Sequence, residues 1–234
     1  MRPWHKYKIS ECNEPLIPIP PEISRFVPHP YLSLGAPYGN DIDPWKLRVD
    51  VVRRLQLAQR LLQIEASTLR LLVFDAWRPI RVQEFMISYS IAQECYSRGI
   101  NPHESSSHPA LQEIKDEVAK FWASPSLDPC TPPPHSTGGA VDLTFVTDEG
   151  EALDMGGKID EIGDISNPDY YAKPLHEIDS SISLRFHSRR NLLQTIMKKA
   201  GFVQHPNEWW HFSFGDQMWA WRSRSCEAIY GLCE

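Results

Sequence analysis

The sequence predicts one α+β domain, residues 1–234, in which a central antiparallel sheet is flanked by helices. Two observations support this class. Stretches with apolar residues at three- and four-residue spacing are mixed with short alternating or continuous apolar stretches, which is the pattern of helices mixed with strands. No internal repeat or low-complexity linker divides the chain, and its 234 residues are enough for one generous domain.

Residues 1–44 are rich in proline and have no helical periodicity, so we expect an extended segment that wraps the domain surface. The first helix is expected to begin at Asp43-Pro44, a cap followed by proline, and to run to about Glu65. Leu69–Asp75 is mostly apolar and predicts a buried strand. The first 75 residues are therefore expected to form an extended surface segment, a helix and a strand of the central sheet.

Two further helices are expected, one from Pro79 towards Gly99 and one around Ala110–Trp122. Residues 140–145 alternate between two faces, which is the period of a strand. A helix over Leu184–Ala200 is expected to precede a hairpin over 203–214 that ends in a strand from Trp209. The tail, residues 218–234, carries no assignment.

Composition narrows the class of function. The net charge of −6 disfavours a nucleic-acid or anionic-membrane partner. The five cysteines are scattered without a CxxC pair, which predicts reduced thiols. The basic start of the chain is not followed by an apolar stretch, so we expect a cytoplasmic protein with no membrane partner. A small-molecule partner is expected from the candidate metal ligands. The sequence does not specify an oligomeric state.

Two short segments supply candidate metal ligands, namely His135, Asp142 and His211. His135 ends a proline-rich loop, and the glycines at 138 and 139 allow a sharp turn and a close approach of the chain to the metal. Asp142 lies in an apolar strand, where an unpaired carboxylate is costly. Two imidazoles and one carboxylate that leave a fourth position open are typical of a catalytic zinc site, with one Zn²⁺ per chain.

Glu208 lies three residues before His211, and residues three apart on a regular strand face opposite sides. We therefore expect Glu208 at the irregular start of the strand or on the preceding turn, which Pro206-Asn207 favours. From there its carboxylate is expected to act on a water molecule rather than on the metal.

The segments His-x-x-Gly-x-Ala-x-Asp (135–142) and Glu-x-Trp-His (208–211) resemble those of the zinc D-alanyl-D-alanine dipeptidases of the vancomycin-resistance type, a group related to the D-Ala-D-Ala carboxypeptidases. The resemblance extends from about Tyr31 to Gly215. Further matching motifs are Phe74-Asp-Ala-Trp-Arg-Pro79, Met155-Gly-Gly-Lys-Ile-Asp160, Arg189-Arg-Asn-Leu-Leu193 and Ala200-Gly-Phe202.

The resemblance implies that His135, Asp142 and His211 bind zinc and that Glu208 is the general base. It also implies that Arg78 stabilises the developing oxyanion. Physical chemistry agrees with the role of Arg78, because a guanidinium stays charged and donates as a fixed fork. The structural alternative for Arg78 is an ion pair with Asp75.

On the substrate side, the resemblance implies that Asp160 anchors a free ammonium group, with Tyr31 as a second contact. The chain departs from the family where serines before the metal histidine help to hold the substrate carboxylate. Pro133 and Pro134 occupy those places here and have no N–H donor. Ser136 is the hydroxyl that remains beside the histidine, so it is our candidate on this side.

The implied activity is hydrolysis of D-Ala-D-Ala to two D-alanines. One alternative is a D,D-carboxypeptidase that trims peptidoglycan stem peptides and would prefer an N-blocked substrate. A second alternative is a non-catalytic binding module with a structural zinc, although structural sites usually have four protein ligands.

Overall fold

The computed structural model describes residues 2–39, 42–102, 109–173 and 179–233. Its centre is a five-stranded sheet with the order β2-β4-β5-β7-β6. All neighbours are antiparallel except β2 and β4, which are parallel, so the predicted antiparallel sheet is a mixed sheet with one parallel pair. The strands are β2 Ser24–Arg25, β4 Leu69–Asp75, β5 Ala140–Thr147, β6 Val203–Gln204 and β7 His211–Ser213.

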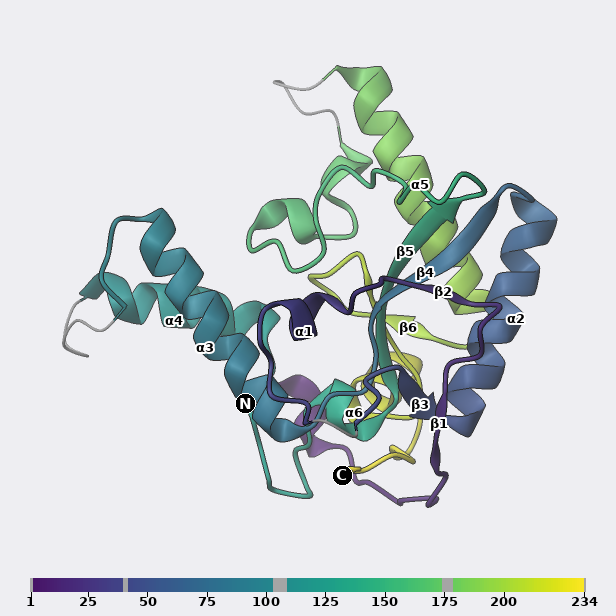
Figure 1. Cartoon of the computed structure of the whole chain (residues 1–234). Coiled ribbons are helices and arrows are strands. Elements are labelled where there is room, and N and C mark those ends of the chain that lie inside the picture. The colour runs from purple at the N-terminus through teal and green to yellow at the C-terminus, as the bar shows by residue number, and fades with distance from the viewer. Residues whose placement is uncertain (1, 40–41, 103–108, 174–178, 234) are drawn as a thin grey trace.

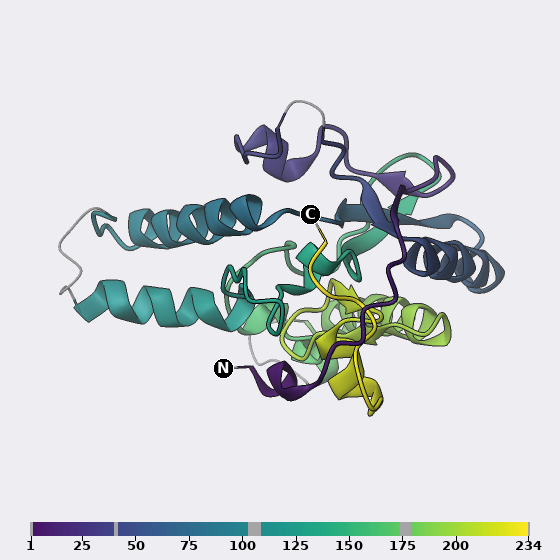
Figure 2. The same ribbon diagram turned by 90° about the horizontal axis from the view of Figure 1, so that it is seen from below.

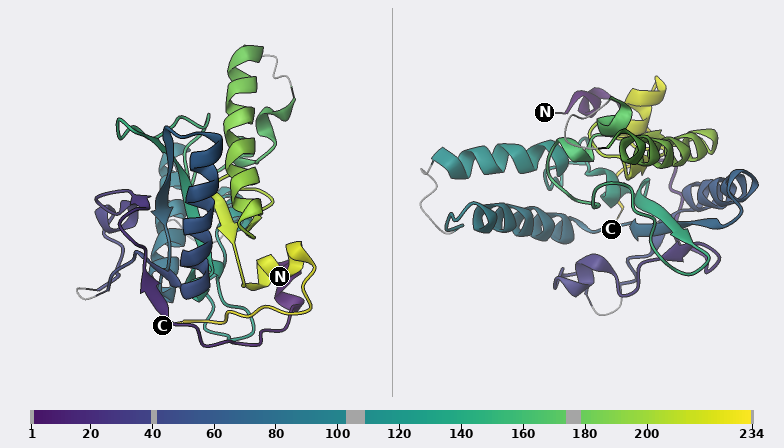
Figure 3. Two further views of the ribbon diagram at one scale, coloured as in Figure 1. Left: turned by 90° about the vertical axis from the view of Figure 1, so that its right-hand side faces the viewer. Right: turned by 90° about the horizontal axis from the view of Figure 1, so that it is seen from above.

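Helices α2 (Val49–Glu65) and α5 (Ser180–Lys199) pack side by side on one face of this sheet (Figures 1 and 3). Helices α3 (Ile80–Ser97) and α4 (Pro109–Phe121) form a separate pair that projects from the sheet (Figure 2). The predicted α+β class is confirmed, and each of these helices corresponds to one that the spacing of apolar residues predicted.

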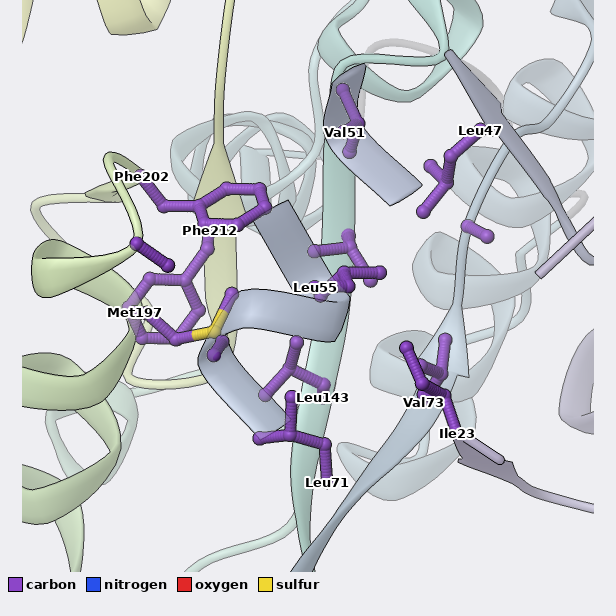
Figure 4. Packing of buried hydrophobic residues seen from close by; sticks show 14 of the residues in the cluster. Ile23, Leu47, Val51, Leu55, Leu71, Val73, Leu143, Met197, Phe202 and Phe212 are labelled. Carbon is purple, nitrogen blue, oxygen red and sulfur yellow. The ribbon is translucent and has the colours of Figure 1, made fainter. Parts of the chain in front are cut away.

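The main core lies between the sheet and helices α2 and α5 (Figure 4). On β5, Val141, Leu143 and Phe145 are fully buried in this core. Because successive strand residues face opposite sides, Asp142 and Thr144 face away from α2 and α5. The same alternation on β7 sends Phe212 into the core and leaves its neighbours on the other face. The polar site therefore occupies the sheet face opposite α2 and α5.

The prediction that the first helix begins at Asp43-Pro44 is wrong. The Asp43 carboxylate accepts a hydrogen bond from the backbone N–H of Trp45 and forms a local turn, not a helix cap. Lys46–Arg48 is then strand β3, antiparallel to β1 (Leu16–Pro18), and the helix starts at Val49. The pairing of β3 with β1, about thirty residues earlier in the chain, therefore determines the start of the helix, although Asp43-Pro44 is a typical helix cap.

The two ends of the chain lie together. In the described part of the first 44 residues, the elements are short and include the 3-10 helix η1 (Pro3–Lys6) and helix α1 (Pro30–Ser33). The tail, which had no assignment, begins within helix α6 (Gln217–Ser223), and α6 packs against η1. In the described parts of the chain, no helix is both long and apolar enough to cross a bilayer.

Candidate metal centre and substrate cavity

Strand register brings the acidic and imidazole groups together. Asp142 on β5 lies directly opposite His211 on β7 and, on its other side, opposite Asp75 on β4. His211 Nδ1 is 3.0 Å from Asp142 Oδ1. All three side chains are at least 95% buried. Three neighbouring strands, far apart in sequence, thus form the floor of the site.

His135 reaches this floor from a 3-10 helix, Pro134–Thr137, that ends at Gly138. Gly138 has a φ of 72°, a backbone conformation that favours glycine, and a Cβ there would also displace the Leu16 side chain. His135 Nε2 lies 3.1 Å from His211 Nδ1 and 3.3 Å from Asp142 Oδ2. The ligand atoms of all three residues lie within 4.8 Å of one another.

The hydrogen bonds of the outer ring nitrogens fix which imidazole atoms face the centre. His135 Nδ1 lies 2.7 Å from the Ala76 carbonyl, which can only accept, so Nδ1 carries the proton and Nε2 a lone pair. His211 Nε2 lies 3.2 Å from the Ser213 hydroxyl oxygen, which can accept a hydrogen bond from Nε2–H. In that tautomer, Nδ1 of His211 carries the lone pair. Such bonds to the outer nitrogen are characteristic of metal-ligating histidines.

The inner atoms then form a cluster of electron-rich groups with no proton to share. Asp142 Oδ1 is buried without a hydrogen-bond partner among the described residues. Two nitrogen lone pairs and a carboxylate that face one buried point repel one another unless a cation lies between them. The three residues therefore fit a metal ion.

Glu208 lies in the turn between β6 and β7, as its spacing from His211 predicted. Its Oε2 is 3.7 Å from His211 Nδ1, and its Oε1 is 3.2 Å from His205 Nδ1. Burial, and then the carboxylates of Asp142 and Asp160, raise the pKa of Glu208 well above its ordinary value. The carboxylate therefore lies beside the three candidate metal ligands and is not part of their cluster.

Arg78 makes the ion pair with Asp75 that was its structural alternative, and it also faces the site. Its Nε is 2.9 Å from Asp75 Oδ2, its Nη1 donates to Gln83, and its Nη2 is 3.7 Å from Asp142. Burial is the largest single influence and lowers the pKa of Arg78, but Asp75 and the other acidic groups around it together outweigh burial, so the pKa is raised. The same Asp75 oxygen is 3.1 Å from His135 Nδ1, so one buried carboxylate orients both groups.

Asp160 lines the same cavity as the candidate metal ligands and Glu208, whereas Tyr31 is not among the lining residues and reaches Asp160 from outside the cavity. The Tyr31 hydroxyl donates a 2.8 Å hydrogen bond to Asp160 Oδ2. Burial, and then repulsion from Asp142, raise the pKa of Asp160 to about 7. A cationic group placed beside Asp160 would relieve this cost. Ser136, by contrast, is fully buried and is not among the residues that line the cavity.

Arg2, Trp4 and His205 are among the cavity-lining residues that sequence reasoning missed. Trp4 is buried and packs edge-on against His205, with ring centroids 5.8 Å apart. Burial lowers the pKa of His205 well below its ordinary value, so this imidazole is neutral. The predicted hairpin over 203–214 contained His205, whereas nothing in the sequence connected residues 2–4 with the site.

A buried His–Asp–His cluster with the Glu208 carboxylate beside it, on the sheet face opposite α2 and α5, defines a candidate metallohydrolase. The D-ala-D-ala dipeptidase model of peptidase family M15 matches residues 33–228. The chain belongs to this family of peptidases.

Relatives and solved structures are similar to the chain to different degrees. A D-alanyl-D-alanine dipeptidase of Synechocystis sp. is 41% identical over 225 residues, which cover 95% of this chain and 90% of the relative. One from Enterococcus faecium is 27% identical over 184 residues, 76% of this chain and 80% of the relative. A vancomycin-resistance D,D-pentapeptidase, VanY, in complex with Zn(II) has 14% identity and a TM-score of 0.44, with 95% and 96% of the two chains covered.

Proposed function

We propose that the protein is a zinc-dependent dipeptidase that hydrolyses D-Ala-D-Ala to two D-alanines. The observation that carries the proposal is the convergence of His135, Asp142 and His211 on one point, with Glu208 beside them and not among the ligands. The substrate follows from family membership and from the Synechocystis relative. The proposal includes the cytoplasmic location expected from the sequence.

The donor set favours zinc. Two imidazole nitrogens and one carboxylate oxygen make up a common three-ligand zinc site that leaves a fourth position open. When bound, a zinc ion supplies a Lewis acid that polarises the scissile carbonyl and makes water more acidic.

The remaining chemistry falls to the chain's own groups. Glu208 takes the proton of the attacking water and delivers it to the leaving amine. Arg78 donates to the oxyanion as it develops, because Asp75 and Gln83 hold its guanidinium in a fixed orientation. Asp160 accepts the free ammonium of the substrate, supported by Tyr31. An anchor for the ammonium selects peptides with a free N-terminus.

The test is a panel of the four stereoisomers of Ala-Ala together with N-acetyl-D-Ala-D-Ala, assayed with and without a chelator. We expect turnover of D-Ala-D-Ala, loss of turnover with the chelator, and recovery with zinc. Preference for the N-acetylated peptide would favour the carboxypeptidase alternative. A zinc-loaded protein that hydrolyses no member of the panel would contradict the proposal.

A further inference from the structure

A free dipeptide carries a positive and a negative end, and the cavity has an evident partner for only the positive one, Asp160. Pro133 and Pro134 precede the metal histidine and have no N–H to offer a carboxylate. The Ser136 hydroxyl does not line the cavity. The carboxylate of the substrate therefore requires a donor from elsewhere.

Two arginines line the cavity among the described residues, Arg78 and Arg2. Arg78 is committed to Asp75, to Gln83 and to the side of Asp142. Arg2 contacts no carboxylate among the described residues. Because the proposed mechanism assigns Arg78 to the oxyanion, the charge of Arg2 is the one that remains for the substrate carboxylate.

The position of Arg2 is fixed by the end of helix α4. Its guanidinium donates to the backbone carbonyls of Ala119 (2.7 Å), Lys120 (2.9 Å) and Trp122 (3.2 Å). These bonds use three of the five N–H donors of an arginine, and the remaining two have no partner among the described residues. Trp4 packs on His205 and on Trp221 and holds the segment against the cavity.

Electrostatics agree with this geometry. Burial lowers the pKa of Arg2, and the carboxylate of Glu208 acts in the opposite direction, so Arg2 is partly desolvated within the field of the proposed base. A carboxylate ligand would restore the interaction that desolvation removes, and charge-assisted hydrogen bonds are the stronger kind.

We propose that Arg2 binds the C-terminal carboxylate of the dipeptide, so that residues 2–6 complete the substrate site from outside the segment that the family model matches. The inference rests on the proposed function for the identity of the ligand. Arg2 and Asp160 then hold the two ends of one zwitterion, which makes Arg2 a determinant of specificity.

The test is calorimetry on zinc-loaded protein in a Glu208→Gln background, which prevents turnover during the titration. The ligands are D-Ala-D-Ala and its C-terminal amide, and the variants are Arg2→Gln and Arg2→Lys. We expect Arg2→Gln to weaken binding of the acid about 10- to 100-fold and to leave binding of the amide within about threefold. Arg2→Lys, which keeps the charge, is expected to recover part of the loss.

A merely structural role gives a different result. If Arg2 only caps helix α4, Arg2→Gln weakens the acid and the amide equally or not at all, and the inference is overturned. If Arg2 discriminates acid from amide but the enzyme with Glu208 intact hydrolyses neither, the proposed function fails and the inference stands. If neither ligand binds the protein with Arg2 intact, both fail.

Discussion

The floor and the rim of the cavity are built in different ways. The floor consists of Asp75, Asp142 and His211 on hydrogen-bonded neighbouring strands, and His135 reaches it from the turn that leads into β5. The rim gathers Arg2, Asp160 and other groups from segments that meet only in the folded chain. Backbone register therefore sets the geometry of the floor, whereas tertiary packing sets that of the rim. We expect changes in the floor to abolish the reaction and changes in the rim to alter binding.

The largest effect is expected for Asp142→Asn. The substitution removes the negative ligand between the two imidazoles, so we expect loss of the metal and a fall in activity of about 1,000-fold or more. Metal content per chain and hydrolysis of D-Ala-D-Ala measure the two effects. Thr144→Val is the matched control, because Thr144 lies on the same face of the same strand and is buried. Full metal content in Asp142→Asn would remove Asp142 from the ligand set.

Glu208→Gln is expected to lower kcat by about 100- to 10,000-fold and to leave the metal content unchanged. The amide keeps the size of the side chain but cannot take a proton from water. Atomic absorption and steady-state kinetics on the same preparation separate the two readouts. Near-normal turnover in a zinc-loaded variant would exclude Glu208 as the base.

The comparison of floor and rim also explains what could be predicted from the sequence. The placement of Asp142 and His211 on strands could be predicted because strand side chains alternate with a period of two. The placement of Glu208 before the strand could be predicted because a spacing of three residues does not fit that period. Helix α2 was predicted with the wrong start, since the pairing of β3 with β1 is a tertiary contact that local signals do not contain. The position of Arg2 in the cavity depends on hydrogen bonds to backbone carbonyls 117 to 120 residues away. Neither the spacing nor the composition of the sequence encodes such contacts.

A smaller effect is expected when the support of the floor is removed. The Ser213 hydroxyl faces His211 Nε2, so Ser213→Ala leaves that ring without its outer partner. Loss of such a partner usually weakens metal affinity by 10- to 100-fold. Zinc competition with a chromophoric chelator measures this. An unchanged affinity would mean that strand register alone orients His211.

The smallest catalytic effect is expected on the rim. Asp160→Asn removes the charge that meets the substrate ammonium, so we expect KM for D-Ala-D-Ala to rise about tenfold with kcat nearly unchanged. Asp164→Asn, an exposed acid of the same loop, is the control. A fall in kcat as large as that of Glu208→Gln would show that the rim takes part in the chemistry.

The same variant is expected to stabilise the metal-free protein. The groups that act on Asp160 are Tyr31 and Arg78, which favour its ionised form, and Asp142 and Asp75, which together with burial oppose it and raise its pKa to about 7 from 3.8. A raised folded-state pKa means that stability falls between pH 4 and 7 as the buried carboxyl ionises, by at most about 4 kcal/mol. Asparagine cannot ionise, so we expect Asp160→Asn to raise the Tm of chelator-treated protein by several degrees at pH 8 and by little at pH 4.5. An equal gain at both pH values would mean that the carboxylate carries no electrostatic cost, and the anchor for the ammonium would then lack the driving force that we assign to it.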